Sequence, residues 1–148
     1  MNKIELKIEK LPHCKELPQY QTEGAAGMDL RAAIDSPIKL ESLERVLIPT
    51  GIKIELPHGY EAQIRPRSGM AIKHGISMIN TPGTIDEDYR GEVKIAVVNL
   101  SKDTYSIEPN ERIAQMVISK VEQPKIVPVL HVSETQRGAG GFGSTGKN

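Results

Sequence analysis

The sequence predicts an all-β domain, a β-sandwich or barrel of short strands, for three reasons. Apolar residues recur mostly with a period of two, the period at which side chains share one face of a strand. Clusters of Pro, Gly, Asn and Ser separate these runs, as turns separate strands. Ten prolines are spread over 148 residues, and a proline inside a helix breaks it. Long helices are therefore not expected.

The strands are expected in the following order. Isoleucine and leucine alternate with Lys and Glu over residues 4–8 and again over 52–56. A Pro-His-Gly turn then leads into a strand over 60–65, and valine and isoleucine alternate over 93–97. The run 126–132 is rich in β-branched residues and predicts a further strand.

One short helix of one or two turns is expected over residues 68–74. We see no linker or second domain, so residues 1–133 are expected to form one β domain. Residues 134–148 differ in composition and are expected to form a flexible glycine-rich arm. Apolar positions that face outward in a sandwich favour self-association, but the residues do not choose between two and three subunits.

Composition excludes several classes of protein. Lys plus Arg and Asp plus Glu both number 19, whereas nucleic-acid and membrane-surface binders usually have a basic excess. No apolar run is long enough to cross a bilayer, and the acidic, alternating N-terminus is unlike a signal peptide. Cys14 is the one cysteine, which favours a reducing compartment. A cytoplasmic location is expected.

The single phenylalanine, Phe142, lies in the glycine-rich tail. Five of residues 134–148 are glycine, and glycine loses the most backbone entropy on ordering. One alternative is a disordered tail with an incidental aromatic residue. The other is a lid, in which the ring stacks on a flat ligand while Arg137 and backbone amides hold an anion.

Five segments carry the residues suited to chemistry: 25–31, 66–71, 80–92, 111–116 and 137–146. Taken singly, each has an ordinary explanation as a cap, a surface ion pair or a solvated loop. Together they favour a nucleotide with several phosphates and a divalent ion. The candidate anion donors are Arg67, Ser68, Gln115, Arg137, Ser144 and Thr145, with Asp29 as a carboxylate that holds Mg²⁺ through water.

Two other ligand sites are not expected. The four histidines show no spacing of zinc ligands, and Cys14 lacks a partner. Residues 141–147 match a Walker phosphate-binding pattern up to Lys147, but Asn148 replaces the required Ser or Thr. A Walker motif also needs a following helix.

The five segments, in this order and spacing, resemble the five motifs of the trimeric dUTP pyrophosphatases (dUTPases). The resemblance spans about residues 24–146 and rests on these stretches: Ala26-Gly27-Met28-Asp29-Leu30, Pro66-Arg67-Ser68-Gly69, Gly83-Thr84-Ile85-Asp86-Glu87-Asp88-Tyr89-Arg90-Gly91, and Arg137 through Gly146. It implies a homotrimer of jelly-roll subunits with three active sites shared between chains. It also implies cleavage of dUTP to dUMP and pyrophosphate, which limits uracil in DNA and supplies dUMP for dTMP synthesis.

The resemblance implies a role for each matching residue. Asp86 is the expected general base, and a hairpin over 80–94 is expected to hold uracil. Tyr89 is expected to pack under the deoxyribose and exclude a 2′-hydroxyl, and Asp29 to hold Mg²⁺ through its waters. The remaining expected substrate contacts are Asn80, Gly83, Thr84, Ile85 and Lys94 at the base, Arg67, Ser68, Gly69 and Gln115 at the phosphates, and Arg137, Phe142, Gly143, Ser144 and Thr145 in the closing arm.

Two rival functions remain open at this point. A dCTP deaminase of similar fold would need groups that activate water at the cytosine ring, and the intact uracil hairpin and tail disfavour it. A nucleotide-responsive regulatory protein would keep the fold without the chemistry, and the presence of Asp86 disfavours that alternative.

Overall fold

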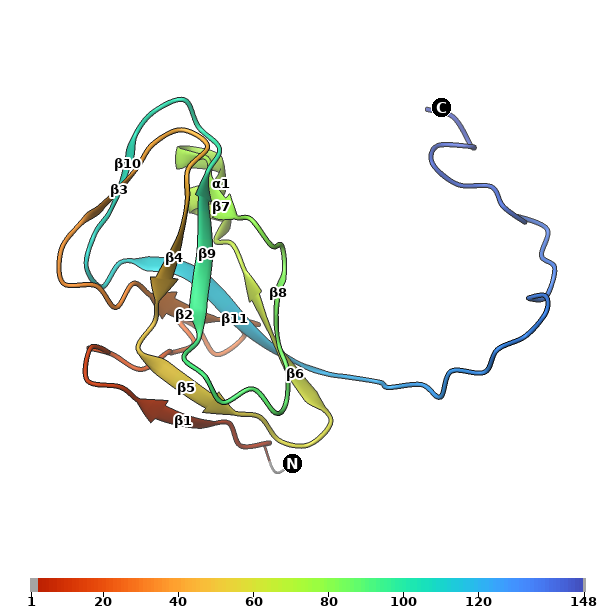
Figure 1. The fold of residues 1–148 in the computed structure, drawn as a ribbon, viewed down its shortest axis with the longest axis horizontal. Coiled ribbons are helices and arrows are strands. Elements are labelled where there is room, and N and C mark those ends of the chain that lie inside the picture. The colour runs from red at the N-terminus through yellow and green to blue at the C-terminus, as the bar shows by residue number, and fades with distance from the viewer. Residues whose placement is uncertain (1–2, 148) are drawn as a thin grey trace.

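The computed structural model describes residues 3–147 as a body of short strands with a long C-terminal segment that leaves it (Figure 1). The elements in chain order are β1 (Lys7–Lys10), β2 (Met28–Arg31), β3 (Ile38–Leu40), β4 (Arg45–Pro49), β5 (Ile52–Glu55), β6 (Tyr60–Arg65), α1 (Ser68–His74), β7 (Ile76–Met78), β8 (Gly83–Ile85), β9 (Lys94–Asn99), β10 (Tyr105–Ile107) and β11 (Arg112–Lys120). The all-β prediction is confirmed.

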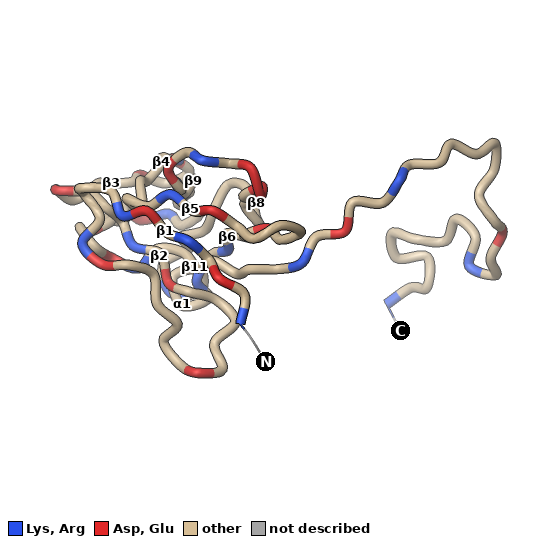
Figure 2. Tube along the Cα trace, turned by 90° about the horizontal axis from the view of Figure 1, so that it is seen from below, with Lys and Arg blue, Asp and Glu red and all other residues tan. Residues whose placement is uncertain are grey.

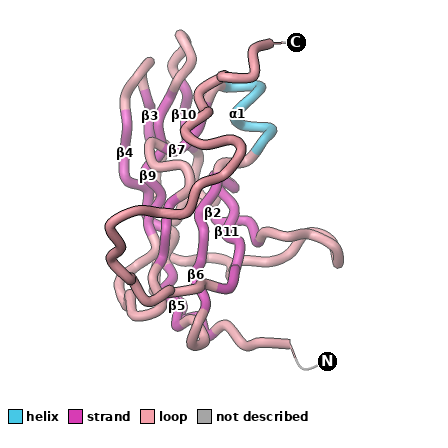
Figure 3. Tube along the Cα trace, turned by 90° about the vertical axis from the view of Figure 1, so that its right-hand side faces the viewer, coloured by secondary structure: helices cyan, strands magenta, loops and turns pink. Residues whose placement is uncertain are grey.

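The strands form four small antiparallel sheets rather than one closed barrel. The largest has the order β2-β11-β6-β8, and a second has the order β4-β9-β7. The pairs β1-β5 and β10-β3 complete the set. Figure 3 shows the strands in the body, with α1 at one end and loop along the departing segment.

An aliphatic core lies between these sheets. Its largest fully buried side chains include Leu30, Ile48, Ile64, Ile95 and Met116, which come from β2, β4, β6, β9 and β11. Burying each such side chain contributes about 1.5–3 kcal/mol. The period-two pattern is visible in β6, where Ala62 and Ile64 are buried between more exposed neighbours. The core therefore needs no large aromatic residue.

Buried Asn99 ties the loops at one end of this core. Its Nδ2 donates to the carbonyls of Leu40, at 2.9 Å, and of Asp103, at 2.8 Å. Its Oδ1 accepts from the backbone N–H of Ser101 at 2.9 Å. These bonds satisfy a polar side chain that would otherwise be costly to bury.

The local predictions agree with the structure in most places. The strand over 60–65 and the helix over 68–74 are confirmed to the residue. Gly75 ends α1 with a left-handed φ of 66°, a conformation that suits glycine. The expected strands at 4–8, 52–56 and 93–97 are observed as β1, β5 and β9, with ends that differ by no more than three residues from those expected.

The strand predicted over 126–132 is wrong for the single chain. This segment has no strand partner in the described structure, and Ile126 and Leu130 are almost fully exposed. A strand requires backbone hydrogen bonds to a neighbour, and the segment extends beyond every sheet of its own chain (Figure 1). The β-branched run is therefore an apolar stretch without a strand partner among residues 3–147 of this chain.

The hairpin predicted over 80–94 is also wrong as a pair of strands. Within it, β8 pairs with β6, whereas β9 pairs with β4 and β7. Residues 86–93 therefore form a loop that connects two different sheets. A pattern of apolar runs shows where strands are, but not which strands pair.

Charged residues of both signs are interspersed over the body (Figure 2), in agreement with the balanced composition. Among residues 3–147, no helix has the length and apolar character needed to span a bilayer.

Candidate active site

Five of the predicted site residues line one cavity of about 270 Å³. The cavity lies where β8 ends and β9 begins, because these two strands belong to different sheets and separate at that point. Its predicted wall residues are Thr84, Ile85, Asp86, Tyr89 and Lys94, and Leu47 and Glu92 complete it. The cavity thus joins a carboxylate, an aromatic ring and an apolar wall within one chain.

Tyr89 folds back over its own loop to reach this wall. Its hydroxyl donates to the backbone carbonyl of Glu92 at 2.9 Å. Its backbone N–H donates to the Asp86 carbonyl at 3.2 Å, which closes the turn between them. A Cβ at Gly91 would overlap the Tyr89 hydroxyl. Gly91 is therefore required for this position of the ring.

Asn80 and Gly83 lie at the base of β8, next to the cavity residues. A Cβ added at Gly83 would lie 3.3 Å from the Asn80 Nδ2. The absence of a side chain at Gly83 leaves room for that amide. The structure therefore places both predicted residues near Thr84 and Ile85.

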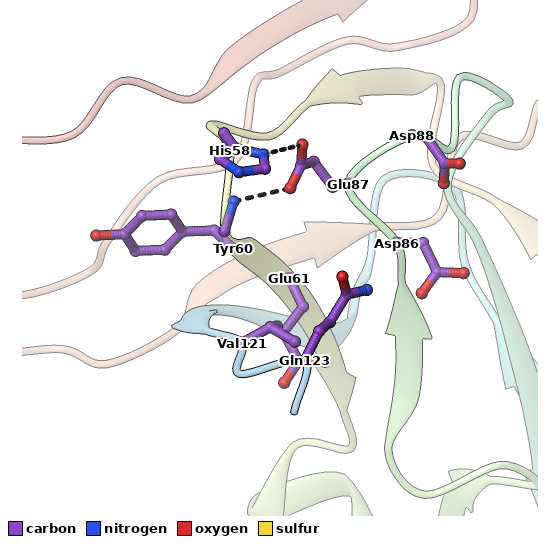
Figure 4. A pocket seen from close by; sticks show the side chains of 9 residues that line it. His58, Tyr60, Glu61, Asp86, Glu87, Asp88, Val121 and Gln123 are labelled. Atoms are coloured by element: carbon purple, nitrogen blue, oxygen red, sulfur yellow. Dashed lines mark hydrogen bonds and ion pairs between the residues drawn. The ribbon is translucent and has the colours of Figure 1, made fainter. Parts of the chain in front are cut away.

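The loop after β8 is tied to the turn between β5 and β6 through Glu87. The Glu87 Oε2 accepts from the backbone N–H of Gly59 at 2.7 Å, and Oε1 lies 2.9 Å from the His58 Nδ1. Figure 4 shows Glu87 turned toward His58, away from the side on which Asp86 lies. The hydrogen bond from Gly59, followed by that from His58, lowers the pKa of Glu87. The hydrogen bond to Glu87 raises the pKa of His58.

A second cavity of about 510 Å³ is lined by this loop, by the turn between β5 and β6 and by residues that follow β11 (Figure 4). Four carboxylates line it: Glu61, Asp86, Glu87 and Asp88. Like charges in such a cavity repel a polyphosphate. The smaller cavity, which holds Tyr89 and Lys94, is therefore the better fit for an anionic nucleotide.

A separate cationic cluster surrounds Asp29 on β2. The Arg112 Nη1 donates to the Asp29 Oδ2 at 3.1 Å, and the Arg67 Nε lies 3.5 Å from Oδ1. Arg67 also donates through Nη1 to the Arg112 carbonyl at 3.0 Å. The Asp29 side chain is only 14% exposed. The carboxylate thus fixes the orientation of two guanidinium groups.

Gln115, on β11, faces the same cluster. Its Nε2 donates to the Pro66 carbonyl at 3.1 Å. A Cβ at Gly27 would lie 2.6 Å from the Gln115 Oε1, so Gly27 leaves room for the amide. Ser68 and Gly69 follow Arg67 in the first turn of α1. All the residues predicted to hold phosphates outside the arm therefore lie together.

The cationic cluster and the cavity lie far apart within one chain. Asp29, Gln115 and Arg65 are in register across β2, β11 and β6, whereas Ile85 on β8 pairs with Ala62. Asp86 therefore lies three strand spacings across the sheet and four residues along the strand direction from Asp29. These two displacements combine to a separation of about 19 Å. One chain therefore holds two partial sites.

The arm carries the third group of predicted residues away from both partial sites (Figure 1). Phe142 is fully exposed, with a positive φ of 50°, and Gly143 follows with a φ of 83°. The Arg137 Nε donates to the Gly140 carbonyl at 2.7 Å, within the arm itself. Ser144 and Thr145 lie in the same series of short turns. Among the residues that the structure describes, no hydrogen bond joins the arm to a predicted site residue outside it.

Several supporting residues were missed by the sequence analysis. Gly27 and Gly91 stand inside the motifs, so their position in the sequence was a usable signal. Glu92 likewise lies within the segment 80–92. His58 and Gly59 act through contacts with the distant Glu87, and nothing local in the sequence indicates those contacts.

The side chains around Asp29 are compatible with only one mode of magnesium binding. Among residues 3–147, no group of three or more His, Cys, Asp or Glu side chains could hold a metal ion. Asp29 is a single carboxylate, and both its oxygens face guanidinium groups. Mg²⁺ usually keeps several waters and takes few carboxylates together with substrate phosphates. Because guanidinium groups occupy both carboxylate oxygens, an ion at Asp29 would have to be held through water.

Comparison with known proteins agrees with this geometry. The dUTPase family model matches residues 14–146. A deoxyuridine 5'-triphosphate nucleotidohydrolase of Fusobacterium nucleatum is 58% identical over 147 residues, covering 99% of this chain and 100% of the relative. An enzyme of the same name from Rhizobium etli is 56% identical over 133 residues, covering 88% of this chain and 85% of the relative.

Solved structures of dUTPases are also similar to this chain. A Staphylococcus bacteriophage 80alpha dUTPase with dUPNHPP has a TM-score of 0.88 and 27% identity, covering 98% of this chain and 100% of that one. A dUTPase of phage phi11 of S. aureus has a TM-score of 0.79 and 22% identity, covering 89% of this chain and 100% of that one. The second likeness concerns the fold alone.

Proposed function

This chain belongs to the dUTPase family, and on that premise we propose that it hydrolyses dUTP to dUMP and pyrophosphate. The observation that carries the proposal is the cavity in which Asp86, Tyr89 and Lys94 meet. The relatives that are 56–58% identical bear the name of this activity. The phage 80alpha enzyme was solved with dUPNHPP.

Asp86 is the general base in this proposal. It takes a proton from a water molecule, and the water oxygen forms a bond to the α-phosphorus while the bond from that phosphorus to the bridging oxygen breaks. Pyrophosphate leaves with the electron pair of the broken bond. Asp86 suits this role because its neighbour Glu87 is held by Gly59 and His58, which fixes the backbone beside the base.

The cavity selects the nucleoside. Asn80 and the backbone at Thr84, Ile85 and Lys94 would pair with uracil, and a base that cannot complete such hydrogen bonds is rejected strongly. Tyr89 would pack against the deoxyribose. Its ring is fixed by the Glu92 carbonyl and by Gly91, so a 2′-hydroxyl would meet a wall that does not move aside.

The cationic cluster binds the phosphates. Arg67, Ser68, Gly69 and Gln115 would hold them, with Asp29 setting the direction of the Arg67 guanidinium. Magnesium, when bound with Asp29 through water, supplies positive charge that stabilises the leaving pyrophosphate. Arg137, Phe142, Gly143, Ser144 and Thr145 would close over the substrate and exclude bulk water.

The complete site is assembled from more than one chain in a homotrimer of jelly-roll subunits. The water activated by Asp86 must reach the same triphosphate that Arg67 holds, within about 3 Å. The separation of about 19 Å between the two partial sites prevents this inside one chain. The exposed apolar run at 126–132 also needs a surface to cover it, and a second copy provides one. Residues 134–148 would then act as the arm of a neighbour.

The location of the enzyme is proposed to be cytoplasmic. Cys14 is buried and unpaired in the described structure, and free thiols persist in reducing compartments.

Steady-state pyrophosphate release tests the activity directly. With dUTP, dCTP, dTTP and UTP at equal concentration, the proposal predicts rapid release from dUTP alone. Release from dCTP together with ammonia would identify a deaminase instead. Binding without release would identify a regulatory protein.

A further inference from the structure

The side chains of His13 and Glu92 form a hydrogen-bonded pair across 79 residues of sequence. The His13 Nε2 lies 2.9 Å from Oε1 and 3.0 Å from Oε2 of Glu92. The Glu92 side chain is only 14% exposed, and that of His13 is 36% exposed. The proposed function uses the backbone carbonyl of Glu92 but neither of these two side chains, so the pair needs its own explanation.

The turn that carries His13 is anchored to the body. The backbone N–H of Leu11 donates to the Gly51 carbonyl at 2.8 Å, and that of Cys14 donates to the Leu11 carbonyl at 3.1 Å. Cys14 is buried against Gly51, and a Cβ added at Gly51 would overlap Cys14. His13 therefore approaches Glu92 from a fixed position and not from a loose terminus.

Glu92 connects this turn to the nucleoside cavity. It lines the cavity beside Tyr89, and its backbone carbonyl accepts the Tyr89 hydroxyl at 2.9 Å. The next residue is anchored as well, because the Val93 N–H donates to the Ile52 carbonyl at 2.8 Å. The side chain of Glu92 is held by His13 alone among the contacts of the described residues. A change at His13 thus alters the residue on which the tyrosine rests.

We propose that His13 is a positioning residue for sugar discrimination, which acts by holding Glu92, the residue whose backbone carbonyl accepts the Tyr89 hydroxyl. The inference rests on the proposed function, in which Tyr89 packs against the deoxyribose. A ring held in one place excludes a 2′-hydroxyl better than a ring that can shift, because a rigid wall cannot accommodate the extra atom. His13 thereby sharpens the preference for dUTP over UTP without touching substrate.

His13→Ala tests the proposal through kcat/KM for dUTP and for UTP. The ratio of the two values should fall about three- to tenfold, since one partly exposed hydrogen-bonded pair makes a modest net contribution. The change should appear mainly in KM for the two nucleotides, with kcat for dUTP little altered. His13→Gln, whose amide can still donate to Glu92, should recover part of the ratio.

Lys7→Ala is the matched control. It removes an ion pair of the N-terminal segment, Lys7 to Glu55 at 2.9 Å, which does not line the nucleoside cavity. It should leave the ratio unchanged. A thermal melt of each variant shows that the chain is folded.

The most informative comparison adds His13→Ala to a Tyr89→Phe protein, because Tyr89→Phe removes the hydroxyl that contacts the Glu92 carbonyl. If His13 acts through this contact, His13→Ala should cause no further loss of discrimination in that background. A lower melting temperature for His13→Ala with an unchanged ratio would make the pair purely structural and overturn the inference. If Tyr89→Ala itself leaves the ratio unchanged, the sugar role of Tyr89 fails, and the role of His13 fails with it.

Discussion

The separation between Asp86 and the cationic cluster can be tested with trimers that combine chains carrying different inactivating substitutions. Asp86→Asn removes the base, which should lower turnover by about 10²–10⁴. Arg67→Ala removes a phosphate contact, which should lower it by about 10²–10³. In a trimer whose sites each combine Asp86 of one chain with Arg67 of the next, a mixed trimer always contains one intact site. Purified mixed trimers should therefore recover about one third of wild-type turnover, and an unsorted equal mixture about one quarter.

The experiment uses co-expression with two affinity tags, so that mixed trimers assemble during folding and can be separated from homotrimers. Pyrophosphate release per trimer is the assay. The control combines Asp86→Asn with Tyr89→Ala, whose defects lie in the same cavity of the same chain. That mixture should turn over no faster than the mean of its two components, because every site carries one of the two defects. A mixture of Asp86→Asn and Arg67→Ala that likewise shows no gain would show that each chain builds its own site, and the distance argument would be wrong.

Four further predictions concern the base, the arm and the pair that supports the base. Asp86→Asn should still bind a non-hydrolysable dUTP analogue in calorimetry, whereas Asp88→Asn should retain more turnover, and near-normal turnover of Asp86→Asn would move the base elsewhere. Hydrogen exchange should show that residues 134–147 become protected with that analogue and magnesium but only weakly with dUMP. Phe142→Ala should lower turnover and leave the free energy of unfolding unchanged, because the ring is fully exposed, and a loss of several kcal/mol would identify a buried structural residue instead. The His58 pKa is raised and the Glu87 pKa is lowered, so their pairing should stabilise the fold between the two values. It should be lost as pH rises through the His58 pKa or falls through that of Glu87. His58→Ala should thus destabilise slightly at about pH 6 and not at about pH 8, as measured by denaturant unfolding, and an equal effect at both values would contradict this.

Local features of the fold could be predicted because their causes are local. The alternation in 60–65 and the turn residues around it are sufficient to place β6, and α1 begins after Pro66 and ends at Gly75. The run 126–132 has an equally strong β pattern but no strand partner in the part of the chain that the structure describes. A β pattern is the same whether the neighbouring strand belongs to this chain or to another one. The pattern therefore did not reveal that the strand predicted over 126–132 is not formed within the single chain.

The residues of the candidate site also fall into two groups, those that the sequence indicates and those that only the structure reveals. The motifs named the residues with chemical roles, because a carboxylate, a guanidinium or a tyrosine at a given spacing is visible in the sequence. The supports of those residues are not visible there. His13 lies 79 residues from Glu92, and His58 lies 29 residues from Glu87. Such pairs depend on how distant turns meet in space.

The sequence by itself thus determined the all-β class, the short helix, the glycine-rich arm and the residues that belong to the dUTPase motifs. Only the tertiary structure decided that β8 pairs with β6 and not with β9, and that Asp29 holds Arg67 and Arg112. It also decided that Asp86 and Asp29 lie on opposite edges of one sheet. The physical reason is that side-chain period and turn chemistry act over a few residues, whereas strand order is set by long-range packing of the core.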